Sequence, residues 1–291
     1  MKDNFGRNIN YLRLSVTDRC DLRCKYCMPL KNNFFFKKEE FLSQSELRTI
    51  SKVLFKLGIR KIRITGGEPL IRKDIIEYLS YLSYKKKKGF LDEILISTNG
   101  TQLKKYSKKL SELGVKRINI SLDSLVTEKY NFITNGGDLK KVLDGIYEAK
   151  KYGLEIKINT VLLKNFNEDE IMSMVKWCAK NEFKQSFIEV MPVGELFTNR
   201  KNQYLPVSYA KKLINKHLGL KEIKFKTNGP SRYFETKKLK NIIGFISPIS
   251  DHFCATCNRI RITSNGKLYP CLGDNGSVNL KPFISNKNDF E

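Results

Sequence analysis

The sequence predicts an α/β protein in which strands and helices alternate about six times, as in a (β/α)6-type barrel. The first observation is a series of short β-branched runs, which indicate strands at residues 11–16, 61–65, 93–98, 117–122, 155–163 and 186–190. The second is helical spacing of apolar residues between them, at residues 45–57, 73–84, 103–113, 139–152 and 169–181. Strands that alternate with helices form a parallel sheet with right-handed crossovers, which either stays open or curls toward a barrel.

Small and polar residues after the predicted strands favour the barrel. "GGEP" follows the second strand, "NG" the third, Asp123 the fourth and "MPVG" the sixth. Barrels build their active sites at the C-terminal ends of their strands, although ordinary turns use the same residue types. A cysteine cluster directly after the first strand adds to these residues, so we expect a site at this end.

The alternation stops near residue 192, which predicts two parts: a barrel over residues 1–191 and a C-terminal region over residues 192–291. The second part contains one predicted helix, in "NQYLPVSYAKKLINKHLGL", and a small β unit made from "NIIGFISPIS" and "RIRITSNGKLYPCL". "SNG" between alternating residues is typical of a hairpin.

Composition limits the class of protein. Of the 291 residues, 41% are hydrophobic, and the first residues lack the apolar stretch of a signal peptide. We therefore expect a soluble, cytoplasmic protein with no membrane partner. Seven cysteines without a secretory signal favour metal or redox chemistry over disulfides. The net charge is +24, but the lysine runs at 85–88 and 237–240 are typical of solvated surface, so no nucleic-acid partner is expected.

Three cysteines lie close together in "VTDRCDLRCKYCMP", at Cys20, Cys24 and Cys27. A tetrahedral structural zinc site needs a fourth ligand, and no other Cys or His lies nearby. Three thiolates instead suit a [4Fe–4S] cluster with one iron left open, because four thiolates would close it.

A second group of three, Cys254, Cys257 and Cys271, lies in "FCATCNRIRITSNGKLYPC". On spacing alone, a structural zinc site completed by His252 remains an alternative for this group.

"CDLRCKYC" resembles the motif of radical S-adenosylmethionine enzymes. Both ends together resemble the GTP 3′,8-cyclase family of molybdenum cofactor biosynthesis, through "FGRNINYLRLSVTDRC", "KIRITGGEPL", "INISLD", "FIEVMPVG" and "FCATCNRIRIT". The resemblance covers nearly the whole chain. It implies a partial (β/α)6-type TIM-like barrel with a small C-terminal β unit that carries a second cluster. It also implies a lyase with two [4Fe–4S] clusters that uses S-adenosylmethionine to cyclise GTP to (8S)-3′,8-cyclo-7,8-dihydroguanosine 5′-triphosphate, the first step of molybdopterin biosynthesis.

The resemblance also implies roles for individual residues. The cluster ligands are Cys20, Cys24 and Cys27 for the first cluster and Cys254, Cys257 and Cys271 for the second. The residues implied for S-adenosylmethionine are Tyr26, Gly66, Gly67, Glu68, Ser121 and Met191. Those implied for GTP are Arg13, Arg63, Ser97, Lys157, Arg259, Ile260 and Arg261.

Charge supports the GTP positions, because a triphosphate needs several cations and arginine binds phosphate oxygens in pairs. Arg13, Arg63 and Lys157 occupy alternating positions on three predicted strands that point into one barrel. The alternative is surface charge on half-buried strands. Cys178 is interpreted as a packing residue, and His217 as part of a solvated helix.

The family resemblance further implies an external electron donor and a downstream cyclic pyranopterin monophosphate synthase, and it leaves a homodimer open. Family members end in a tail with two glycines, whereas the printed sequence ends at "NKNDFE". We therefore expect poor coupling of the radical to ring closure unless another chain supplies that tail. "ITNGGDL" has glycines where the family commonly has arginines, which predicts one missing basic contact. Two alternatives remain open: a peptide-modifying radical enzyme with an auxiliary cluster, and a zinc-stabilised basic RNA-binding protein.

Overall fold

One curved sheet carries the fold of the computed structural model, which describes residues 1–4, 6–27, 35–191, 203–225, 229–251, 257–271 and 276–285. Its 12 strands lie in the order β12-β11-β10-β1-β2-β3-β4-β5-β6-β9-β8-β7. The six predicted strands are confirmed and run parallel to one another. They are β1 (Tyr11–Ser15), β2 (Lys61–Thr65), β3 (Glu93–Thr98), β4 (Val115–Ser121), β5 (Glu155–Leu162) and β6 (Lys184–Glu189).

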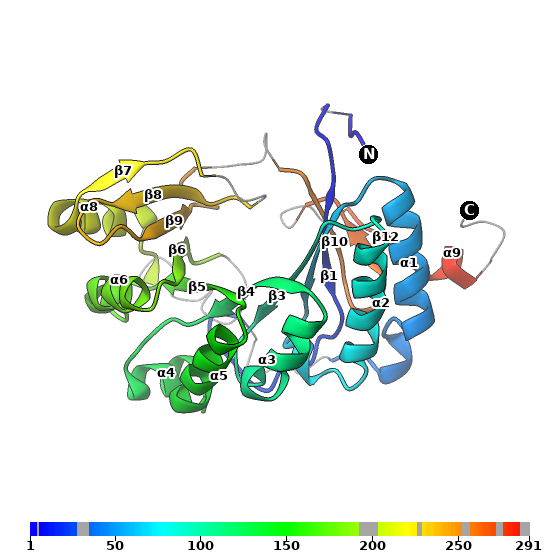
Figure 1. Ribbon diagram of the computed structural model, residues 1–291, viewed down its shortest axis with the longest axis horizontal. Coiled ribbons are helices and arrows are strands. Elements are labelled where there is room, and N and C mark those ends of the chain that lie inside the picture. The colour runs from blue at the N-terminus through cyan, green and yellow to red at the C-terminus, as the bar shows by residue number, and fades with distance from the viewer. Residues whose placement is uncertain are drawn as a thin grey trace.

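The helices form an arc outside this sheet (Figure 1). The predicted ones are α1 (Gln44–Lys56), α2 (Ile75–Lys87), α3 (Leu103–Glu112), α5 (Leu139–Lys151), α6 (Ile171–Lys180) and α8 (Val207–Leu218). Short 3-10 helices span Lys38–Glu40, Pro69–Ile71 and Glu168–Glu170. None of the helices in the described part of the chain combines the length and apolarity that a bilayer crossing requires.

Local chemistry explains where these helices begin and end. At the start of α1, Ser43 and Glu46 form a capping box, which satisfies backbone N–H groups that the helix leaves free. The helix α4 (Thr127–Thr134) was not predicted, because it is short and buries only Tyr130, Ile133 and Thr134, which gives a weak apolar pattern. Asn135, with φ 56°, ends α4 in the left-handed conformation, so "TNGG" has a structural role in this chain.

Strand alternation separates the two faces of the sheet. The isoleucines of β2, β3 and β4 pack with the helices in the largest hydrophobic core. Because successive side chains of a strand point to opposite faces, the residues between these isoleucines point away from the helices, to the inner face of the sheet. Arg63 on β2, Leu95 on β3 and Asn119 on β4 are of this kind. Arg117 lies two residues before Asn119 and so shares its face.

The C-terminal strands extend both edges of the same sheet. β10 (Arg259–Ile262) pairs in parallel with β1 and continues through β11 (Lys267–Tyr269) and β12 (Val278–Asn279). At the other edge, β9 (Ile242–Ile246) pairs in parallel with β6 and continues through β8 (Arg232–Thr236) and β7 (Leu220–Glu222).

These edges differ from the predicted arrangement of the C-terminal region. The "SNG" hairpin is confirmed as the antiparallel pair β10–β11, with Gly266 at φ 84°. However, "NIIGFISPIS" and the hairpin do not form one small unit: they lie at opposite edges, and the sheet continues past residue 191. An exposed edge strand offers unpaired backbone groups, and both edges of the barrel gain partners in this way.

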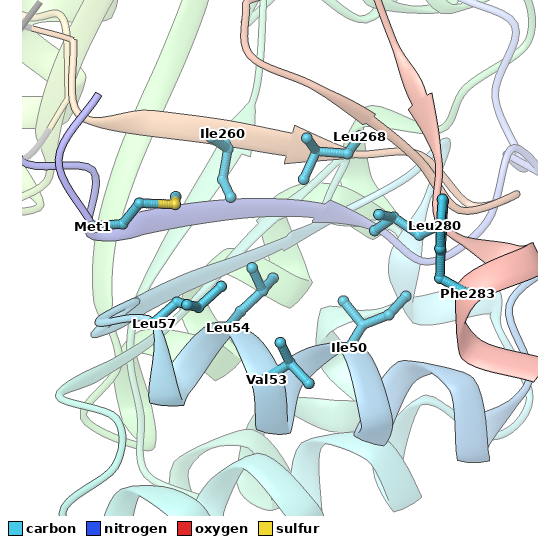
Figure 2. A pocket seen from close by; sticks show the side chains of 9 residues that line it. All are labelled: Met1, Ile50, Val53, Leu54, Leu57, Ile260, Leu268, Leu280 and Phe283. Carbon is cyan, nitrogen blue, oxygen red and sulfur yellow. The ribbon is translucent and has the colours of Figure 1, made fainter. Parts of the chain in front are cut away.

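An apolar cavity of about 330 Å³ lies where α1 meets β10, β11 and the short helix α9 (Lys281–Ser285), as Figure 2 shows. Ile50, Leu54 and Ile260 belong to the core between the sheet and the helices, so the cavity is on the helix side. Its lining contains no charged side chain and offers nothing to a triphosphate. The lining residues are Met1, Ile50, Val53, Leu54, Leu57, Ile260, Leu268, Leu280 and Phe283.

Candidate active site

Four arginines form a row across the inner face of the sheet, which we call the arginine row. Arg13 on β1 is in register with Arg261 on β10 and with Arg63 on β2. Arg63 is in register with Leu95, and Leu95 is in register with Arg117 on β4. Side chains in register on neighbouring parallel strands share a face, so the row places four guanidinium groups on one wall.

Among the described residues, no ion pair joins any of these four arginines to a carboxylate. Arg63 is buried, and its Nε donates a hydrogen bond of 2.6 Å to Tyr11 Oη. In the described chain, the buried Nε atoms of Arg13 and Arg117 have no hydrogen-bond partner. Burial and the charges of Arg261 and Arg63 lower the pKa of Arg13 to about 9, which leaves it charged at neutral pH. Such a wall attracts a polyanion.

Lys157 adds a fifth cation in the next row. It is in register with Asn119, which is in register with Ser97. The lysine is buried, and its Nζ donates to Tyr233 Oη at 2.8 Å. Burial lowers the pKa of Lys157, although Tyr233 partly opposes this. The predicted GTP residues Arg13, Arg63, Ser97 and Lys157 therefore lie on one face.

The second cysteine group lies beside Arg259 and Arg261. Cys257 is half-buried and Cys271 is exposed, whereas Cys254 and His252 lie outside the described residues. Burial would raise the pKa of Cys257, but the charge and hydrogen bonds of Arg259 outweigh it and lower that pKa. A neighbouring cation favours the thiolate, the form that binds iron. Ile260 points into the hydrophobic core, so only its backbone is available to a nucleotide.

The first cysteine group lies in a loop that the sheet holds in place. Asp21 accepts hydrogen bonds from Asn99 Nδ2 at 2.7 Å and from Thr101 Oγ1 at 2.6 Å. The backbone N–H of Cys27 donates to Cys24 O at 2.9 Å. Burial raises the pKa of all three thiols, to about 11 for Cys20.

The donor set of this loop fits a four-iron cluster. No three side chains of Cys, His, Asp or Glu in the described part of the chain converge as ligands of a single metal ion. A [4Fe–4S] cluster has no such need, because each cysteine binds a different iron. Three thiols lie in one loop, and their charges interact with one another. A bound metal deprotonates the thiols despite their burial.

Gly66 and Gly67 permit a close approach between the end of β2 and the loop that leads to Cys20. A Cβ on Gly66 would lie 2.7 Å from Thr17 O, and one on Gly67 would lie 2.2 Å from Arg19 O. The backbone N–H of Gly67 donates to Thr17 O at 2.8 Å. The glycines are therefore required by chain packing, whatever ligand their backbone contacts.

The remaining residues predicted for S-adenosylmethionine lie at the C-terminal end of the strands. Ser121 is exposed at the end of β4, and Met191 is half-buried after β6. Tyr26 is hydrogen-bonded to the buried Asp123, whose pKa is raised to about 6 by burial. The Glu68 side chain is engaged within the protein: it accepts from Leu70 N, Thr98 Oγ1 and Asn99 N.

Five inner-face residues escaped the sequence analysis: Tyr11, Arg117, Asn119, Asn159 and Tyr233. Arg117 had a usable signal, since strand alternation places it on the same face as Ser121. Tyr233 had none, because its strand pairs with the barrel through β9, far away in sequence. Outside the site, Cys178 is buried in the core and His217 is exposed on α8, as predicted.

Comparison with known proteins agrees with this geometry. A family model described as "Radical SAM superfamily" matches residues 14–178, and one described as "Molybdenum Cofactor Synthesis C" matches residues 183–291. Solved structures share the fold at low identity. SuiB of Streptococcus suis, bound to S-adenosylmethionine, has a TM-score of 0.69 at 18% identity and covers 96% of this chain and 64% of its own. Methylornithine synthase (PylB) has a TM-score of 0.58 at 16% identity and covers 94% of this chain and 77% of its own.

The chain has an open α/β barrel with three cysteines in the loop after its first strand, and the radical SAM model matches more than half of it. It is therefore a member of the radical S-adenosylmethionine superfamily. Among curated proteins, the GTP 3′,8-cyclases of Brucella ovis and Brucella canis are 44% identical over 281 residues, which cover 97% of this chain and 81% of each relative. Within the superfamily, the chain belongs to the GTP 3′,8-cyclase family.

Proposed function

We propose that the chain binds GTP on the inner face of its barrel and joins C3′ of the ribose to C8 of the guanine. The observation that carries this proposal is the position of the arginine row and Lys157 between the two cysteine groups. A triphosphate needs several cations, and guanidinium groups bind its oxygens in pairs. The buried, unpaired Nε atoms of Arg13 and Arg117 support a ligand at this face.

The topology supports a direction for the substrate. Because β10 runs parallel to β1, Cys257 before β10 and Cys20 after β1 lie at opposite ends of the sheet. Cys271 follows β11, which is antiparallel to β10, and so lies at the same end as Cys257. We assign S-adenosylmethionine to the Cys20 end and the guanine base to the Cys257 end.

Two [4Fe–4S] clusters and S-adenosylmethionine belong to this function. When bound, the reduced cluster and S-adenosylmethionine supply the radical that removes a hydrogen from C3′ of GTP. The residues of the chain position the reactants: Arg13, Arg63 and Lys157 hold phosphates, and Ser97 offers a hydroxyl beside them. Tyr26 and Ser121 lie at the end assigned to S-adenosylmethionine.

The reaction balances as an isomerisation. The C3′–H bond breaks, the C3′–C8 bond forms, and N7 gains a hydrogen from one electron and one proton. An external electron donor must supply that electron and the electron that cleaves S-adenosylmethionine. We further propose that residues 1–191 generate the radical and that residues 192–291 hold the base. A reducing cytoplasm suits the free thiols, and a downstream synthase that takes up the cyclic product completes the proposal.

The test is anaerobic turnover of the reconstituted protein with GTP deuterated at C3′, S-adenosylmethionine and dithionite. We expect deuterium in 5′-deoxyadenosine and a nucleotide that is isomeric with GTP but chromatographically distinct. Cys24→Ala should abolish both products. Cys257→Ala should keep slow release of 5′-deoxyadenosine without deuterium, whereas Cys178→Ala, away from the site, should match the wild type.

If the wild-type protein released only 5′-deoxyadenosine without deuterium, GTP would be excluded as the source of the abstracted hydrogen. Equal loss of S-adenosylmethionine cleavage in folded Cys24→Ala and Cys257→Ala proteins would contradict the division of roles between the two cysteine groups.

A further inference from the structure

Arg117 is an inner-face cation to which neither the resemblance nor the sequence analysis gave a role. It is a half-buried residue of β4 and lies between the exposed Lys116 and Ile118, which packs in the core. Its Nε is buried without a hydrogen-bond partner, and no ion pair of Arg117 is present among the described residues. A buried N–H group without an acceptor is costly unless a ligand supplies one.

The nearest acidic candidate is already engaged. Glu155 on β5 is in register with Arg117, but its carboxylate bonds to Lys184 at 3.1 Å and lies 4.0 Å from Lys116. In contrast, Arg117 adds to the positive field at Lys157. Burial is the main cause of the lowered pKa of this lysine, and the charge of Arg117 lowers it further. Two cations on one wall create a positive potential that favours an anion between them.

The place of Arg117 in the sheet separates it from the second cysteine group. Four strand spacings lie between β10 and β4, which is roughly 19 Å along the sheet. The guanine end of the substrate is assigned to β10. The end that reaches β4 and β5 is then the part of GTP that carries its charge, the phosphates.

We propose that Arg117, together with Lys157, binds the outer phosphates of the nucleotide and so selects a triphosphate over a monophosphate. This inference rests on the proposed function, since it assumes that a guanine nucleotide occupies the inner face. The guanidinium offers two parallel N–H donors to phosphate oxygens, which a lysine cannot reproduce.

Binding measurements on the cluster-loaded protein test the inference. Calorimetry under anaerobic conditions compares GTP, GDP and GMP with the wild type, Arg117→Gln, Arg117→Lys and Lys116→Ala. Lys116 is the matched control: it is the adjacent residue on β4, its side chain is 63% exposed, and the same charge is removed. Circular dichroism confirms that each variant is folded.

We expect Arg117→Gln to weaken GTP binding by about tenfold or more and GMP binding by less than about twofold. The ratio of the two affinities should therefore fall toward one. Arg117→Lys should give an intermediate ratio, because it keeps the charge without the fork. Lys116→Ala should leave all affinities unchanged.

The possible outcomes distinguish a failure of the inference about Arg117 from a failure of the proposed function. If the wild type binds GTP but Arg117→Gln keeps its GTP-to-GMP ratio, the inference about Arg117 is overturned and the proposed function stands. If the wild type binds no guanine nucleotide, the proposed function fails. Should Arg117→Gln not fold, an Arg117→Lys protein with the wild-type ratio overturns the inference by itself.

Discussion

The carboxylate of Glu68 accepts a hydrogen bond from the backbone N–H of Asn99, with 2.7 Å between Oε2 and N. This bond ties the end of β2 to the end of β3. The Asn99 side chain continues the connection, since its Nδ2 donates to Asp21 in the loop of the first cysteine group. The position of that loop therefore depends on a buried network drawn from three separate segments.

Replacing Glu68 with Gln should weaken this network. The two carboxylate oxygens of Glu68 accept hydrogen bonds from three donors. In glutamine an NH2 group replaces one of these oxygens, so at least one of the three donors would face another donor. We expect a loss of about 1–3 kcal/mol in the free energy of unfolding, measured by urea titration. Glu112→Gln, on the exposed end of α3, is the control. Equal stability of the two variants would show that the network does not support the loop.

Gly67→Ala should prevent assembly of the first cluster. A Cβ at this position would lie 2.2 Å from Arg19 O, so the loop leading to Cys20 must move away. The hydrogen bond from Glu68 N to Arg19 O would be lost with it. We expect about half of the wild-type iron after reconstitution, measured with a colorimetric iron assay.

Gly89→Ala is the control for the glycine substitution. Gly89 has φ 78° and nothing within 4 Å of an added Cβ, so this change costs about 1–2 kcal/mol of backbone strain and should keep the iron. Full iron in the Gly67→Ala protein would mean that the loop tolerates the displacement.

Metal content is the third prediction. Two three-cysteine sites should hold two [4Fe–4S] clusters, or about eight irons per chain after anaerobic reconstitution. Cys20→Ala should reduce this to about four, while Cys178→Ala, in the hydrophobic core, should keep about eight. Stoichiometric zinc with little iron would contradict the cluster assignment and favour the structural alternative for the second cysteine group.

The fourth prediction concerns pH and Lys157. Burial lowers the pKa of this lysine below its ordinary value of 10.5, so it loses its proton at a lower pH than an exposed lysine. GTP affinity should fall as pH rises toward 10.5, because the neutral amine binds phosphate weakly. In the same range the unfolded chain binds more protons than the folded one, so the stability of the nucleotide-free protein should rise with pH.

Lys157→Arg should move the contribution of this group to higher pH, because a guanidinium holds its proton more strongly than an amine. The measurement is the GTP dissociation constant and the unfolding midpoint of both proteins between pH 7 and 10. Parallel pH profiles for the wild type and Lys157→Arg would exclude Lys157 as the titrating group.

The sequence by itself determined the six barrel strands, the helices between them except α4, and the two cysteine groups, because each depends on local patterns. β-branched runs, 3.6-residue periodicity and cysteine spacing are properties of short segments. Alternation along β1, β2 and β5 likewise predicted that Arg13, Arg63 and Lys157 share a face, and register confirms it.

Only the tertiary structure decided which distant segments meet. The C-terminal strands β9 and β10 both look like ordinary strands in sequence, yet they complete opposite edges of one sheet. Edge pairing depends on backbone hydrogen bonds, which carry no residue code. Tyr233 reaches Lys157 only because β8 follows β9 at that edge. Arg117 joins the arginine row only because a register shift between Ile94 and Leu95 brings β4 into line with β3. Register is a relation between strands, and for this reason no single segment contains it.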